Sequence, residues 1–71
     1  MVDINKLKGK IVEKGYSISS LANATGIKKG ALYRKLSNGS KFLIKDADTI
    51  AHVLCLNAEE VNAIFFSQYV A

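Results

Sequence analysis

Apolar residues recur at intervals of three and four positions along most of the chain, which is the spacing of amphipathic helices. The first such segment follows Asp3, a suitable N-cap, and Gly15 stops it in the left-handed conformation that glycine favours. Its predicted inward face consists of Ile4, Leu7, Ile11 and Val12. Lysines fill many of the other positions, so we expect a helix with one solvated side.

Two shorter helices are predicted in the middle of the chain. Ser17 is placed to cap a helix over residues 18–25, which Gly26 ends. The next helix is expected over about residues 28–37, before the turn sequence Asn38-Gly39-Ser40. Its inward residues are Ala31, Leu32 and Leu36.

The last part of the chain predicts two more helices. One is expected over about residues 45–54, and Asn57 with Glu60 forms a capping box for the other. Their inward candidates are Ala47, Ile50, Ala51, Val53 and Leu54, then Val61, Ile64 and Phe65. With no proline, repeat or linker in 71 residues, we predict one all-α domain over residues 1–71, a compact bundle of about five short helices.

Charge is divided unevenly between the two parts of the chain. The net charge is +4, but all ten Lys and Arg residues lie within residues 1–45 beside two acids, which gives +8 there. Residues 46–71 hold four acids and no Lys or Arg, which gives −4. The basic first part favours a polyanionic partner.

The residue content excludes several kinds of site. One cysteine, Cys55, and one histidine, His52, make neither an internal disulfide nor a structural zinc site, so we expect no metal and no cofactor. Asp46 and Asp48 are interpreted as charges that favour a helix start, and nothing pairs a nucleophile with a base. We therefore expect no enzyme and no small-molecule substrate.

The sequence also bears on location. No apolar run reaches the length of a signal peptide or of a membrane span. An unpaired cysteine favours the reducing cytosol. We expect a cytoplasmic protein without a membrane partner.

The most informative stretch is residues 17–39, SISSLANATGIKKGALYRKLSNG. Two short helices joined by a tight glycine-containing turn form a helical corner. Ala22 allows close approach, and Gly26 redirects the chain. With Leu32 and Leu36 inward, the outer face of the second helix carries Lys28, Lys29, Gly30, Tyr33, Arg34 and Ser37. Most of these side chains can donate hydrogen bonds to phosphates or base edges.

This stretch resembles the helix-turn-helix of the lambda-repressor/Cro-like (XRE-type) DNA-binding family, and the whole chain is similar to small phage Cro-like repressors. The segment TGIKKGALYRKLSNG is also similar to the recognition helix of Fis-like proteins. The resemblance implies that this helix enters the major groove. It implies base-reading roles for Lys28, Lys29, Gly30, Tyr33 and Arg34. It implies phosphate contacts from Ser17, Ser19, Asn38, Ser40 and Lys41.

Three positions depart from the family pattern. Lys35 stands where a buried Ile or Val is common, which leaves the rotation of the third helix open. Leu43 replaces a threonine cap, and Cys55 replaces a glycine that would end the fourth helix. A left-handed cysteine there would be strained.

Each candidate also has a plainer interpretation. Lys28 and Lys29 can form a solvated helix start, although two cations there oppose the helix dipole. Arg34 can contact a phosphate rather than a base, and Tyr33 can simply cover the helix surface. Gly30 costs about 1 kcal/mol relative to alanine and can be without function. The lysines of the first helix are interpreted as a solvated face that adds long-range attraction.

The uncharged ending holds four large apolar side chains, Phe65, Phe66, Tyr69 and Val70. A small core cannot take all of them, and an exposed remainder marks an interface. We expect residues 61–71 to include a dimer contact. A heteromeric contact and ordinary core packing are the alternatives.

The expected function is transcriptional regulation by a Cro-like repressor in a bacterial cell. A homodimer would occupy a double-stranded DNA operator and block polymerase. The alternative is an antirepressor-type modulator that pairs with a companion repressor and changes its DNA binding. The uncharged tail and the acidic second part favour that alternative.

Overall fold

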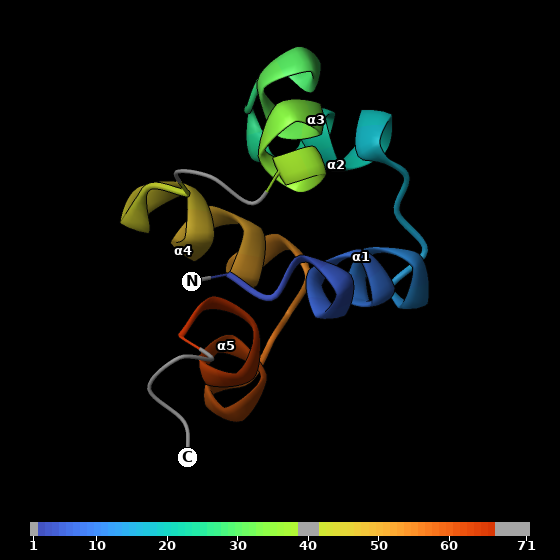
Figure 1. The fold of residues 1–71 in the computed structure, drawn as a ribbon. Helices are drawn as coiled ribbons and strands as arrows, with labels where there is room; N and C mark the ends of the chain where they lie inside the picture. The colour runs from blue at the N-terminus through green and yellow to red at the C-terminus, as the bar shows by residue number, and fades with distance from the viewer. Residues whose placement is uncertain (1, 39–41, 67–71) are drawn as a thin grey trace.

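The computed structural model describes residues 2–38 and 42–66, and these form five helices with no strand. The helices are α1 (Ile4–Glu13), α2 (Ile18–Thr25), α3 (Lys29–Asn38), α4 (Ile44–Val53) and α5 (Ala58–Phe65). Figure 1 places α2 and α3 at one end and α5 at the other, with α1 and α4 between them. The prediction of an all-α bundle of five short helices is confirmed.

Side-chain caps begin three of the helices where the sequence predicts them. The Asp3 carboxylate accepts the Lys6 backbone N–H at 3.1 Å. Ser17 and Ser20 cap α2 reciprocally, and Asn57 and Glu60 do the same for α5. These contacts join residues three apart, so the sequence alone is enough to specify them.

The bounds of α3 and α4 differ from the prediction by one residue. Asn38, predicted to open a turn, is the last residue of α3, and residues 39–41 lie outside the described part of the chain. The fourth helix begins at Ile44, and its N-cap residue Leu43 makes no side-chain hydrogen bond to the helix. The predicted departure at Leu43 is therefore an uncapped helix start.

All five helices contribute to one core. Its buried residues are Leu7, Ile11, Leu21, Ala22, Leu32, Leu36, Ile50, Leu54, Ile64 and Phe65. Helix α2 packs against α3 and α4, and α1 packs against α5 and α3. The inward placement of Val12 is wrong, because its side chain is 75% exposed. It follows Ile11 by about 100° around the helix and so turns past the edge of the buried stripe.

Two polar contacts join α1 and its N-cap residue to α5. The Asp3 N–H donates to the carbonyl of Ile64 at 2.7 Å, and the Lys10 ammonium pairs with the Glu60 carboxylate. The hydrogen bond to Glu60 raises the pKa of Lys10, and the same bond lowers the pKa of Glu60. Lys10 thus belongs to a contact between helices, whereas Lys6, Lys8 and Lys14 are exposed as expected.

Helices α1 and α4 end in the same hydrogen-bonded arrangement. After α1, Gly15 has φ 83° and the Tyr16 N–H donates to the Ile11 carbonyl. After α4, Cys55 has φ 55° and the Leu56 N–H donates to the Ala51 carbonyl. Both are Schellman ends. Cys55 therefore occupies the strained left-handed position that its sequence context predicts, and its side chain is exposed.

Replacing Cys55 with glycine should raise the free energy of unfolding by about 0.5–1 kcal/mol, because glycine adopts positive φ without steric cost. The exposed thiol gives up no core contact. Gly15→Ala is the matched reverse change at the end of α1 and should lower stability by about 1 kcal/mol. Urea unfolding of the two variants measures both effects; a destabilised Cys55→Gly protein would contradict the strain.

Candidate nucleic-acid interface

A three-residue connection, residues 26–28, joins α2 to α3. Gly26 has φ 79°, and its N–H donates to the carbonyl of Ala22 at 2.9 Å. The Thr25 hydroxyl donates to the Leu21 carbonyl at 2.8 Å and accepts the Ile27 N–H at 3.3 Å. Local hydrogen bonds therefore fix the direction in which α3 leaves α2.

The rotation of α3 about its axis follows from its two buried leucines. Leu32 is fully buried and Leu36 is 1% exposed, as predicted, while Ala31 is half-buried. The opposite face is exposed and carries Lys29, Gly30, Tyr33, Arg34 and Ser37, with Lys28 just before it. These positions are spaced by one, three and four residues, so they form one continuous surface on the helix.

Contacts of Lys35 with neighbouring residues favour the same rotation of α3 about its axis. It is half-buried, its ammonium lies 3.6 Å from the Asp46 carboxylate, and it stands 5.8 Å from the centre of the Phe42 ring. Asp46, expected to act at the start of α4, therefore pairs with α3 as well as lying in the first turn of its helix. Lys35 joins the helices and belongs to neither the core nor the exposed face.

The cations of the exposed face differ from Lys10 and Lys35 in forming no ion pair within the described part of the chain. No ion pair there involves Lys28, Lys29 or Arg34, whereas Lys10 and Lys35 are both paired. Unpaired surface cations keep their full attraction for an anion. Tyr33 lies among them with 60% of its surface exposed.

A hollow of about 470 Å³ lies between α2 and the start of α3. Polar side chains on its lining are Ser19, Asn23, Lys28 and Lys29. Asn23 is a candidate that sequence reasoning missed. Its spacing of four from Ser19 could have revealed it, because residues four apart share a helix face.

The phosphate-binding residues implied by the family resemblance differ in how accessible their side chains are. Ser19 is exposed beside this hollow. The Ser17 hydroxyl is engaged in the α2 cap, where it accepts the Ser20 N–H at 3.1 Å. The side chain of Asn38 and the whole of Ser40 and Lys41 lie outside the described residues.

The expected interface at residues 61–71 needs one correction. Phe65 is 5% exposed and meets Phe42 edge-on, with ring centres 6.0 Å apart, so its side chain belongs to the core. Phe66 is 41% exposed. Tyr69 and Val70 lie outside the described residues.

Other chemistry is sparse in residues 2–38 and 42–66. His52 and Cys55 are exposed, and no three His, Cys, Asp or Glu side chains there gather as metal ligands would. The longest described helices have ten residues, about half of what a membrane span requires.

Comparison of the chain with protein-family models, with curated proteins and with solved structures finds no match. The relation to Cro-like proteins therefore stays a prediction based on the sequence, and the functional argument depends on the geometry of α2 and α3.

Proposed function

We propose that this protein is a sequence-specific DNA-binding regulator in which α2 and α3 act as a helix-turn-helix. One observation carries the proposal: α3 turns two leucines into the core and leaves exposed a continuous face with Tyr33 and with cations that form no ion pair within the described residues. A helix of this kind fits the major groove of B-DNA, where base edges can be distinguished. Repression follows when the bound protein excludes polymerase from a promoter.

The residues divide into two roles. Arg34 and Tyr33, one turn inside α3, are assigned to base edges, since a guanidinium can bond guanine O6 and N7 together. Lys28, Lys29 and Ser19, around the hollow at the start of α3, are assigned to phosphates and neighbouring base edges. The surface of one small monomer offers few base contacts, so the proposed regulator binds a two-fold operator as a homodimer.

The direct test is selection of bound sequences from random double-stranded DNA by the full chain. We expect enrichment of one symmetric site, bound about a thousandfold or more tightly than unrelated DNA. A selection that enriches no sequence would overturn the proposal and favour the antirepressor-type role, in which a companion repressor is the partner.

Gly30→Ala should have opposite effects on the stability of the fold and on the affinity for DNA. Gly30 has ordinary helical geometry, and a Cβ added to it meets nothing within 4 Å, so alanine should raise the free energy of unfolding by about 0.5–1 kcal/mol. The same methyl group would intrude between α3 and DNA and should weaken operator binding about fivefold or more, equivalent to about 1 kcal/mol.

Gly9→Ala is the matched control for that change. Gly9 is also helical with open space at its Cβ position, but it lies on α1. We expect the same gain in stability with no change in operator binding. Equal DNA affinity of the Gly30→Ala and wild-type proteins, measured by fluorescence anisotropy, would exclude close approach at Gly30.

A further inference from the structure

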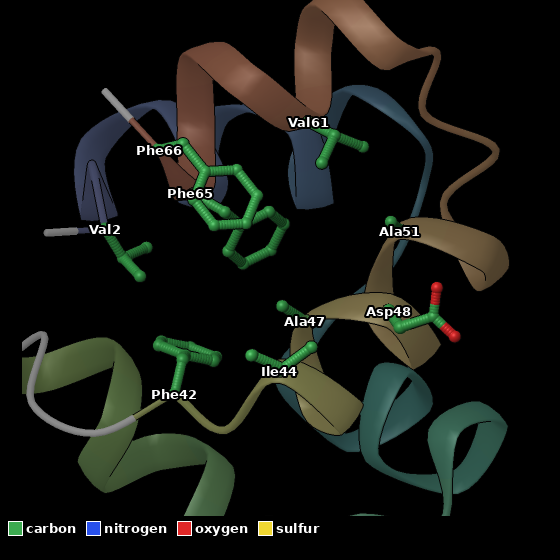
Figure 2. A pocket seen from close by; sticks show the side chains of 9 residues that line it. All are labelled: Val2, Phe42, Ile44, Ala47, Asp48, Ala51, Val61, Phe65 and Phe66. Carbon is green, nitrogen blue, oxygen red and sulfur yellow. The ribbon is translucent and has the colours of Figure 1, made fainter. Parts of the chain in front are cut away.

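An apolar groove, whose lining includes no residue of α3, lies between the start of the chain, α4 and α5. Its volume is about 200 Å³. Figure 2 shows Val2, Phe42, Ala47, Val61 and Phe66 around it, with the Asp48 carboxylate at the rim and directed away from the apolar side chains. Asp48 is the one charged residue of this lining.

Apolar side chains project beside this groove. Ile44 and Phe66, which both line it, are 82% and 41% exposed, and Leu43, which precedes Ile44 in the chain, is 59% exposed. These are three of the five large apolar side chains that the described residues leave exposed. A protruding isoleucine and an apolar hollow therefore occur together on one face, a combination that marks an interaction surface.

We propose that a second copy of this chain covers the groove through a two-fold contact, with Ile44 of each copy in the groove of the other. A two-fold interface uses the same patch on both copies, so the patch must supply both the projection and the hollow. The face around Ile44 supplies both. The inference rests on the proposed function in one respect, since a symmetric operator is what requires a paired protein.

Charge at the rim favours a second copy over a different partner. Lys45 and Asp48 are exposed on α4, three residues apart, and no ion pair within the described residues involves either one. In a two-fold contact, Lys45 of one copy can face Asp48 of the other, and the symmetry makes this pair twice. A partner rich in one sign of charge would leave one of the two groups unmatched.

The test is sedimentation equilibrium of the full chain without DNA, from about 5 to about 500 µM, which covers micromolar to submillimolar dissociation constants. We expect twice the chain mass of 7.7 kDa at high concentration. Ile44→Glu should raise the dimer dissociation constant about tenfold or more, because it puts a charge at the centre of the contact. Folding should tolerate this change, since Ile44 is exposed in the first turn of α4, where an acid is favourable.

Val12→Glu is the matched control, because Val12 is 75% exposed but lies on α1. This substitution should leave the mass of the dimer unchanged. Lys45→Glu alone should weaken the dimer, and adding Asp48→Lys should restore it. A wild-type protein that stays monomeric overturns the proposal and leaves the groove to residues 67–71 or to another protein. A dimer that withstands Ile44→Glu also overturns it, because the contact then lies elsewhere.

The two proposals fail separately. The monomeric Ile44→Glu variant should still bind a half-site, because α3 is untouched. A variant that is monomeric but keeps its half-site preference supports the proposed interface without bearing on the DNA-binding function. A wild-type protein with no sequence preference contradicts the DNA-binding function without bearing on the interface.

Discussion

Leu32→Ala should lower the free energy of unfolding by about 2–5 kcal/mol, the range for a fully buried leucine whose removal leaves a cavity. Leu32 has no exposed surface and lies in the core that unites the five helices. A chain of 71 residues is stabilised by about 4–11 kcal/mol at typical values per residue, so the variant should lose much of its stability. Thermal unfolding followed by circular dichroism measures the loss.

Leu43→Ala is the same substitution at a leucine that is 59% exposed, and it should change stability by about 0.5 kcal/mol or less. A similar cost for both variants would mean that α3 is not anchored through Leu32. The expected contrast matters for function, because the buried leucines determine which face of α3 reaches solvent. The stability of the core and the orientation of the proposed recognition helix thus depend on the same side chain.

The local features of the fold could be predicted from the sequence. The caps at Asp3, Ser17 and Asn57 and the stops at Gly15 and Gly26 depend on residues within one helical turn, and all five are present. Even the left-handed Cys55 follows from its place after α4. Such features can be predicted from the sequence because the residues that cause them lie next to each other in the chain.

Other features depend on contacts between distant segments, and the sequence pattern does not contain them. Val12 matches the apolar spacing but falls outside the buried stripe, whose width is set by how α1 packs. Phe65 was predicted both as an inward residue of its helix and as part of an interface, and its burial against Phe42, more than twenty residues earlier, decides for the core. The groove beside Ile44 combines residues from Val2 to Phe66 and exists only after folding.

Ion pairs formed on folding explain part of the uneven division of charge along the sequence. Lys10 pairs with Glu60, and Lys35 pairs with Asp46. Each pair joins the basic first part to the acidic second part, so some of the charge fastens the fold rather than attracting a partner. The cations left for a nucleic acid at the end formed by α2 and α3 are Lys28, Lys29 and Arg34, which have no ion pair in the described residues.

Arg34→Ala should weaken operator binding by about 1–3 kcal/mol, roughly five- to 150-fold, and relax the preference at one base position, because an arginine that bonds guanine contributes both affinity and discrimination. Arg34 is exposed on α3, so the stability of the fold should stay within about 0.5 kcal/mol of wild type. Anisotropy titrations with operator DNA and with its single-base variants give the affinity and the preference.

Lys8→Ala is the control for loss of a positive charge, because Lys8 is exposed on α1 and forms no ion pair within the described residues. It should weaken all DNA sequences alike, and by less, because a distant cation acts only through long-range attraction that salt screens. The difference between the two variants therefore isolates base contact from charge. Unchanged base preference in Arg34→Ala would show that Arg34 contacts phosphate, and unchanged affinity for operator DNA would show that the exposed face of α3 is not the surface that binds it.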